Sequence, residues 1–434
     1  MVAVRHRQLK HGSKVVVLPG VAAGVGVRAS QVSVAVLEEK RTSETSAMTS
    51  CAEWMRKGNE RRSIIVGGDG TTARVITSAS AVSSDSAVPK STLRIMESHR
   101  APLFLRLLPN ALRGHAETVL PAFFRTGPNV LYRRECLIVP DGGCITLDWP
   151  VDVTDSESQP LAIILPGLAG GSSDAYVRSF VVSAAKAGFT PVVFNARGCA
   201  DSPVTTPQFY SASYTGDARF VVRTLRERFG QRKKIFAAGW SLGANILVNY
   251  LAEEGNASTL SSAASIGNPF NLTMCSSNLA QPGIYRVYDT KLASSLRKIF
   301  SKHIALFRDD RTIDMDLATR AQTVRDFDEA ITAPSFGHKN ADAYYANSCS
   351  ANVIHKVDTR LLCIQAANDP ISLEAAIPFD DIEENPRTDL ILTEGGGHIG
   401  WLCSESGGWL GMEGTLIDRL VLDHWKQILE AKDE

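Results

Sequence analysis

Short apolar runs alternate with amphipathic segments along most of this chain, and this alternation constrains the fold more than any other feature. Each run is long enough for one buried strand, while apolar residues in the intervening segments recur at three- and four-residue intervals, as in amphipathic helices. Strands that alternate with helices predict an α/β fold with a mostly parallel central sheet and helices on both faces. The predicted strands are 161–165, 191–194, 234–238, 361–364 and 390–392, and the last predicted helix carries Ile417, Leu420, Val421, Trp425 and Ile428.

Two further apolar runs precede the alternating region and predict a different pairing. The runs CLIV, at 136–139, and CITLDW, at 144–149, are separated by the short segment PDGG. Gly142 and Gly143 can adopt the positive φ that tight turns require. We therefore expect an antiparallel N-terminal hairpin that leads into the parallel sheet.

Composition and charge limit the classes of partner. The chain has 434 residues with 44% hydrophobic content, enough for a sizeable core. Lys plus Arg and Asp plus Glu both total 46, so the formal net charge is zero and no basic field attracts nucleic acid. The eight cysteines have no CxxC or zinc-like spacing, which indicates a reducing compartment. We expect neither a metal nor an organic cofactor.

The N-terminal region differs in composition from the rest of the chain. Residues 1–100 are rich in Ser, Thr, Ala and Val without sustained periodicity, so we expect a poorly ordered low-complexity tail before a domain at 101–434. No stretch reaches the roughly 18 apolar residues of a membrane-spanning helix, which favours a cytoplasmic protein. A basic segment without acidic residues runs to Val36 and leaves a targeting peptide as the alternative.

The motif GWSLG, at 239–243, lies where the apolar run KIFAA ends and a helical pattern begins. In a nucleophile elbow the chain turns sharply between a strand and a helix, which exposes a serine hydroxyl at the carboxyl edge of the sheet. Gly239 and Gly243 permit the close backbone approach of such a turn. The motif therefore predicts Ser241 as a nucleophile, and the alternative is a serine in a purely structural turn.

A serine hydroxyl is a weak nucleophile near neutral pH and needs a base and an orienting acid. Of the nine histidines, His398 alone follows a late strand in a glycine-rich loop, TEGGGHIGW, and is the candidate base. Asp369 follows the strand at 361–364 and is the candidate acid. Asp380 and Asp381 lie further along the chain and are expected on the surface. The chain order Ser, Asp, His is the one that accompanies a nucleophile elbow.

An oxyanion hole requires two backbone N–H groups, one from the residue after the nucleophile and one from the loop after an early strand. These requirements select Leu242 and Leu168, the second within LPGLAGG. The neighbouring Ser172 and Ser173 lack the elbow motif. We expect one of them to cap the next helix.

A long insertion, at about 268–357, separates the strand after the elbow helix from the strand that precedes Asp369. This is the usual place for a helical cap over an acyl pocket in such folds. Within it, KLASSLRKIFSKHIALFR has an apolar face and several basic residues elsewhere on the helix. The segment predicts a cap helix packed on the domain, and the alternative is peripheral contact with an anionic membrane.

Several long segments occur in a characteristic order: LPGLAGGSSDAYVRSFV, FNARGCADSPVTTPQFYSASYTGD, AAGWSLGANILVNYLAEEG, NPFNL, DAYYANSC, AANDP and GGHIGWL, preceded by GHAETVLPAFF and DGGCITLDW. Together, over about residues 101–430, they resemble the α/β-hydrolases that include mammalian abhydrolase-domain membrane lipases, plant embryogenesis-associated proteins, YheT-type hydrolases and yeast medium-chain ethyl ester synthases. The resemblance implies the α/β-hydrolase fold, the triad Ser241, Asp369 and His398, and esterase or lipase activity. Two features depart from it: the first hundred residues do not look like the membrane anchor of the animal members, and AND replaces an acidic pair.

Three functions are consistent with these features. The first is a serine carboxylester hydrolase (esterase or lipase) that cleaves medium-chain or lipid acyl esters through an acyl-enzyme. The second is an acyltransferase that passes the same acyl group to an alcohol, as the resemblance to the yeast enzymes suggests. The third is a catalytically silent hydrolase fold that binds a lipid or a partner.

Overall fold

The computed structural model describes residues 101–153, 158–403 and 416–431, together with five short strands in the first hundred residues. The tail expected at 1–100 lies mostly outside the described residues. The five strands there are β1 (Val15–Val17), β2 (Val34–Val36), β3 (Ser63–Val66), β4 (Ala73–Ile76) and β5 (Leu93–Met96).

The described strands form one large sheet in the order β1-β2-β6-β7-β9-β8-β10-β11-β12-β13-β5, and β3 pairs with β4 separately. Pairing is parallel from β9 through β13 to β5 and antiparallel between β6 and β7 and between β7 and β9. The sheet therefore has the predicted parallel centre and antiparallel hairpin. The remaining strands are β6 (Tyr132–Ile138), β7 (Cys144–Pro150), β8 (Leu161–Leu165), β9 (Thr190–Asn195), β10 (Ile235–Trp240), β11 (Ser262–Ile266), β12 (Leu361–Ala366) and β13 (Thr388–Thr393).

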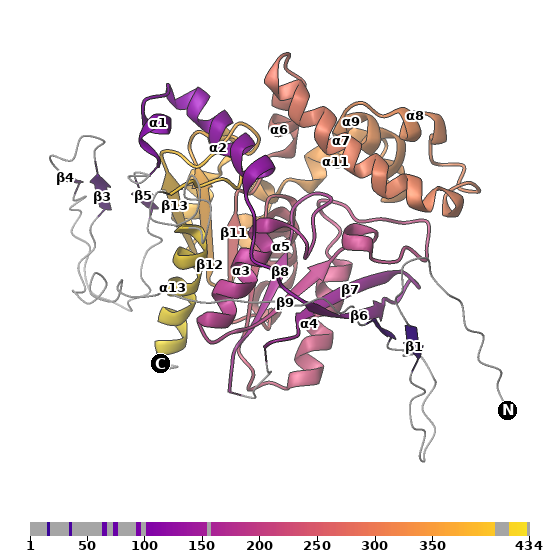
Figure 1. Ribbon diagram of the computed structural model, residues 1–434, viewed down its shortest axis with the longest axis horizontal. Helices are drawn as coiled ribbons and strands as arrows, with labels where there is room; N and C mark the ends of the chain where they lie inside the picture. The colour runs from indigo at the N-terminus through magenta and orange to yellow at the C-terminus, as the bar shows by residue number, and fades with distance from the viewer. Residues whose placement is uncertain are drawn as a thin grey trace.

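Helices cover both faces of the sheet, as the alternating pattern predicted (Figure 1). Because side chains alternate along a strand, Ile163 and Ile164 of β8 lie in different core clusters. The cluster around Ile163 includes residues of α4 (Gly216–Phe229), α5 (Leu242–Glu254) and α12 (Phe379–Glu384), and the cluster around Ile164 includes residues of α3 (Ala175–Lys186) and α13 (Leu416–Glu430).

A helical insertion lies between β11 and β12 in the chain and sits over one end of the sheet (Figure 1). It has its own apolar cluster, centred on Phe300, Phe307 and Phe327. None of the helices in the described ranges is long and apolar enough to cross a membrane. The helices of the insertion are α6 (Leu272–Leu279), α7 (Ile284–His303), α8 (Met315–Arg320), α9 (Val324–Phe327), α10 (Ala333–Ser335) and α11 (Ala341–Ser348).

Two helices that precede the sheet, α1 (Leu103–Arg106) and α2 (Asn110–Phe124), lie at the same end of the molecule as the insertion (Figure 1). Their inner side is apolar, since Leu105 packs with Leu402 beside the loop that follows β13. The two helices thereby connect the start of the domain to the segment that carries His398.

Candidate active site

Ser241 occupies the sharp turn between β10 and α5. Its backbone has φ 50° and ψ −118°, a conformation that non-glycine residues rarely adopt. The turn is fixed because the Ser241 N–H donates to the carbonyl of Ile266 at 2.9 Å and the Ser241 carbonyl accepts from Ala244 and Asn245 in the first turn of α5. This is the geometry of a nucleophile elbow.

The elbow glycines, Gly239 and Gly243, lie where backbones meet. A Cβ on Gly239 would come within 2.5 Å of the Gly243 carbonyl oxygen, and a Cβ on Gly243 would overlap the carbonyl oxygens of Leu165 and Pro166. Neither position therefore accepts a larger residue without displacing β8 or α5.

We expect Gly243→Ala to destabilise the protein by about 3 kcal/mol or more, because rigid backbone atoms cannot move away from the new methyl group. Thermal unfolding checks this effect. Gly188→Ala is the control: Gly188, at the end of α3, has φ 90° but open space around its Cβ, so only the strain of positive φ, about 1 kcal/mol, is added. Equal losses in the two variants would contradict the steric explanation.

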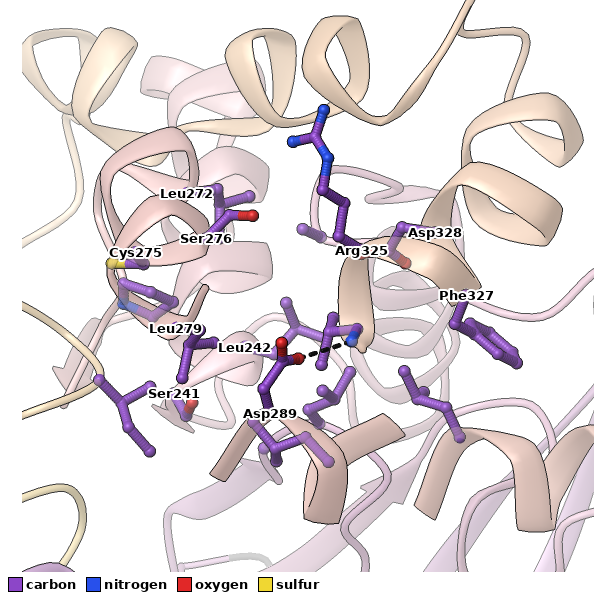
Figure 2. A pocket seen from close by; sticks show the side chains of 18 of the residues that line it. Ser241, Leu242, Leu272, Cys275, Ser276, Leu279, Asp289, Arg325, Phe327 and Asp328 are labelled. Atoms are coloured by element: carbon purple, nitrogen blue, oxygen red, sulfur yellow. Dashed lines mark hydrogen bonds between the residues drawn. The ribbon is translucent and has the colours of Figure 1, made fainter. Parts of the chain in front are cut away.

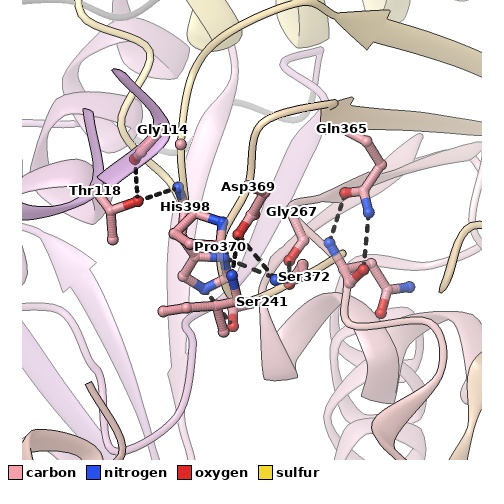
Figure 3. A network of polar contacts seen from close by, with 12 residues as sticks. Gly114, Thr118, Ser241, Gly267, Gln365, Asp369, Pro370, Ser372 and His398 are labelled. Atoms are coloured by element: carbon pink, nitrogen blue, oxygen red, sulfur yellow. Dashed lines mark hydrogen bonds and ion pairs between the residues drawn. The ribbon is translucent and has the colours of Figure 1, made fainter. Parts of the chain in front are cut away.

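The structure brings Ser241, His398 and Asp369 together at the carboxyl ends of three strands (Figure 3). His398 Nε2 lies 3.0 Å from the Ser241 hydroxyl, and His398 Nδ1 lies 2.8 Å from Asp369 Oδ2. Both distances are within hydrogen-bond reach, and the imidazole uses a different nitrogen for each partner. The arrangement has the geometry of a Ser-His-Asp relay.

Asp369 is held in a fixed orientation by its own loop. Its side chain is buried, and Oδ1 accepts the backbone N–H groups of Ile371 at 2.7 Å and Ser372 at 2.8 Å. The other oxygen is thereby directed toward His398. The Ser372 hydroxyl donates to the Gly267 carbonyl at 2.8 Å, which ties this loop to the end of β11 (Figure 3).

The loop that carries His398 is fixed by α2, a contribution that the sequence analysis missed. The His398 N–H donates to Thr118 Oγ1 at 2.8 Å, and the Thr118 hydroxyl donates to the Gly114 carbonyl at 2.8 Å. Glu117 is fully buried and accepts the Gly396 N–H at 2.7 Å. Burial raises the pKa of Glu117 above its ordinary value. No periodic pattern in the segment GHAETVLPAFF marks Glu117 for this role, since the buried side of α2 consists of Gly114, Glu117, Thr118 and Pro121.

The predicted oxyanion donors flank Ser241 and line the same cavity. On the loop after β8, the Gly167 N–H donates to Tyr176 Oη at 2.9 Å and the Ala169 N–H donates to Tyr210 Oη at 2.8 Å. Among the described residues the intervening Leu168 N–H has no hydrogen-bond partner, and neither does the Leu242 N–H at the start of α5. Two N–H groups are thus free to bind an oxyanion.

Comparisons with known proteins identify the family of the chain. The sequence model for the alpha/beta hydrolase fold matches residues 160–402, more than half of the chain. The chain belongs to the α/β-hydrolase family. It is similar to embryogenesis-associated protein EMB8 of Picea glauca, with 48% identity over 67% of this chain and 66% of that protein. The chain thus covers just under two thirds of that relative's length.

Two further relatives carry enzyme names. Phospholipase ABHD3 of Homo sapiens is 32% identical over 74% of this chain and 77% of that protein. Monoacylglycerol lipase of Saccharomyces cerevisiae is 37% identical over 59% of this chain and 58% of that protein. These relatives belong to the groups that the sequence resemblance indicated.

One local prediction for this hydrolase was wrong. Neither Ser172 nor Ser173 caps α3, because the helix begins at Ala175 and its N-cap residue is Asp174. The Ser172 hydroxyl instead donates to the buried Asp148 at 2.5 Å, and the Ser172 N–H donates to Asn195 at 2.9 Å. Ser172 therefore fixes the loop after β8 to the sheet.

A cavity of about 480 Å³ opens beside Ser241 and extends under the helical insertion of the hydrolase (Figure 2). Its walls near Ser241 are mainly apolar. The lining side chains include Leu242 of α5, Leu272, Cys275 and Leu279 of α6, Leu292, Leu296 and Ile299 of α7, and Phe209 and Tyr210 of the loop before α4. Among the described residues, no group of three or more His, Cys, Asp or Glu side chains could hold a metal ion.

Charged side chains line the part of the cavity formed by α7 and α9. The Val324 N–H donates to Asp289 at 2.7 Å, as Figure 2 shows, and Tyr345 donates to the carboxyl of Asp328 at 2.8 Å. Burial raises the pKa of Asp328 to about 6. The cavity therefore has an apolar region next to Ser241 and a more polar region within the insertion.

We expect Asp328→Asn to stabilise the protein above pH 6. The pKa of Asp328 is about 6 in the folded protein and about 3.9 in the unfolded chain, so folding favours the protonated carboxyl. The stability that this gives is complete below about pH 3.9 and is lost as the pH rises through about 6. Melting temperatures measured from pH 3 to pH 8 should begin to separate near pH 4, with the variant higher, and should differ by a constant amount above about pH 7. A difference that does not change with pH would contradict the assignment.

Proposed function

We propose that the protein is a serine carboxylester hydrolase that cleaves medium-chain or lipid acyl esters through an acyl-enzyme. The observation that carries this proposal is the continuous contact from Asp369 through His398 to Ser241 beside an apolar cavity. A serine that is only structural would not need a buried carboxylate aligned behind an imidazole. The names of the relatives also support ester or lipid substrates.

In the proposed mechanism, His398 Nε2 removes the proton from the Ser241 hydroxyl while Oγ attacks the ester carbonyl carbon. The carbonyl oxygen becomes negatively charged and accepts the N–H groups of Leu168 and Leu242. When the tetrahedral intermediate collapses, the ester C–O bond breaks and the imidazolium gives its proton to the leaving alkoxide. In the second half of the reaction, His398 deprotonates a water molecule that attacks the acyl carbon. The bond to Ser241 Oγ then breaks, the imidazolium returns its proton to Oγ, and the carboxylic acid leaves.

The role of Asp369 is to hold His398 in one tautomer. Its Oδ2 accepts the Nδ1–H, which leaves Nε2 free to accept the serine proton. The carboxylate also stabilises the imidazolium that forms during attack. The two backbone N–H groups that donate to Oδ1 keep the carboxylate from rotating away.

We further propose that residues 268–357 act as a cap that selects the acyl chain. Leu272, Leu279 and Leu296 from this insertion line the same cavity as Ser241. A volume of about 480 Å³ is within the usual range for small-molecule sites, and its apolar walls suit a hydrocarbon chain.

Hydrolysis of p-nitrophenyl esters of graded acyl length, beside monoacylglycerol and phosphatidylcholine, tests the function, with Ser241→Ala as control. We expect turnover that depends on acyl length and is lost in the variant. Added ethanol distinguishes the acyltransferase: predominant formation of the ethyl ester would favour it over the hydrolase. Absence of turnover and of acyl transfer with every ester would favour the silent lipid-binding fold.

A further inference from the structure

An exposed apolar surface lies across α1, α2 and the beginning of α7, outside the site described above. Leu103, Leu107 and Leu112 are 69%, 77% and 56% exposed, and Ile284 and Val287 of α7 are 38% and 64% exposed. We call these five residues the apolar rim. Isolated exposed leucines are ordinary, but several large side chains on neighbouring helices mark a surface that contacts something else.

The parts of the rim on α2 and α7 adjoin, because these two helices are in direct contact. His115, one helical turn after Leu112, lies 2.9 Å from the Tyr288 hydroxyl through Nδ1. Its ring also contacts the rings of Tyr285 and Tyr288, with centroids 5.3 and 5.8 Å apart. Leu112 and Val287 therefore belong to one surface that spans the junction between the two helices.

The rim borders the cavity that contains Ser241. Arg286 lies between Ile284 and Val287 in sequence and lines the cavity, as do Leu292 and Leu296 further along α7. On the other side, α2 fixes the loop of His398 through Thr118. The start of α7, which carries two residues of the apolar rim, thus adjoins the cavity.

The exposed charges on the segments that carry the rim, 101–112 and 281–291, are of one sign. Residues 101–112 contain no Asp or Glu, and residues 281–291 contain only Asp289, which is buried and accepts the Val324 N–H. Arg286 and Lys291 are exposed on the same segment. The whole chain has zero formal charge, so this local excess of basic residues is a property of the surface itself.

We propose that the apolar rim docks on the surface of an anionic phospholipid bilayer and places the cavity mouth at the lipid. The large apolar side chains would enter the boundary between head groups and acyl chains, while Arg286 and Lys291 meet anionic head groups. Docking in this position extends the proposed function, since it presents membrane-dissolved esters to Ser241. It assigns membrane contact to α1, α2 and the start of α7 up to Lys291, rather than to the basic residues further along, at 292–308.

Vesicle cosedimentation of the full chain tests the docking without requiring turnover, because Ser241→Ala prevents hydrolysis. The test variant in this background is Leu107→Glu with Val287→Glu, and the matched control is Leu429→Glu with Val151→Glu. Leu429 and Val151 are 39% and 54% exposed but lie outside the rim. We expect binding to phosphatidylcholine–phosphatidylserine vesicles to fall at least about tenfold in the rim variant and less than about twofold in the control.

Anionic lipid and salt provide the second comparison. We expect stronger binding to the mixed vesicles than to pure phosphatidylcholine, and a smaller difference at high salt, since exposed charges are screened. Equal loss in the rim and control variants, or no vesicle binding by the full chain, would overturn the proposal. A dimer in solution that the rim substitutions dissociate would show that a second copy covers the rim, which would also overturn it.

The same rim and control substitutions, made in the protein that retains Ser241, distinguish an effect on membrane docking from an effect on catalysis. We expect hydrolysis of a soluble p-nitrophenyl ester to be unchanged and hydrolysis of an ester embedded in mixed vesicles to fall about tenfold. Equal losses on the two substrates would contradict docking. If neither ester is hydrolysed, the proposed function fails, while the cosedimentation result still decides whether the rim binds lipid.

Discussion

Replacing Ser241 with alanine is expected to lower the turnover of ester substrates by about 10⁵- to 10⁶-fold, the size of loss seen when the nucleophile of a serine relay is removed. The reason is that His398 Nε2, 3.0 Å from the hydroxyl, would have no group to deprotonate for acyl-enzyme formation. The measurement is the rate of p-nitrophenol release under saturating substrate. The rate that remains in Ser241→Ala should come only from substrate binding and from stabilisation of the oxyanion by the two proposed N–H donors.

Ser173→Ala is the matched control for this prediction. Ser173 is an exposed serine on the loop after β8, close in sequence to Leu168. It makes no contact that the proposed chemistry uses, so the control should retain its rate within about twofold. A Ser241→Ala protein that kept a tenth of its activity would show that another residue attacks the ester.

Replacing Asp369 with asparagine is expected to lower turnover by about 10⁴-fold while the fold is retained. An amide cannot stabilise the imidazolium as a carboxylate does, and its NH₂ group favours the wrong tautomer of His398. The affinity for substrate should change much less, because Asp369 lies behind the imidazole. Separate values of kcat and KM check this expectation.

Asp380→Asn is the control for the acid. Asp380 is an exposed carboxylate on α12, eleven residues further along the chain, and its replacement should leave kcat unchanged. A loss below about tenfold for Asp369→Asn would assign the orienting role to another group. Normal thermal stability in both variants is needed to attribute the loss to chemistry.

The sheet and its helices could be predicted from sequence because their signals are local. The run LAIIL coincides with β8, and Gly230 ends α4. A buried parallel strand must be apolar on both faces, so each such run identifies one strand without knowledge of its neighbours. The turn at Ser241 was predictable from a local signal too, because the crowded backbone there requires glycine two residues before and two residues after the serine, at Gly239 and Gly243.

Long-range polar contacts could not be predicted in this way. Glu117 and Gly396 are far apart in the chain but joined by a 2.7 Å hydrogen bond, and no local pattern pairs them. Tyr176 and Tyr210 hold the loop of Leu168 by accepting hydrogen bonds from the N–H groups of Gly167 and Ala169. No periodic pattern in the sequence marks either tyrosine for this role. The candidate oxyanion donors could be proposed from sequence because the strand ends set their positions. The side chains that hold the loop of Leu168 depend instead on how α3 and the loop before α4 pack.

The most direct test of the central claim is mass spectrometry of the intact protein after incubation with a fluorophosphonate, followed by peptide mapping. The Ser241 peptide should carry one covalent phosphonyl group, and Ser241→Ala should carry none. A phosphonyl group on a different residue, or an unmodified Ser241 peptide from protein that hydrolyses esters, would contradict the proposal that Ser241 forms the acyl-enzyme.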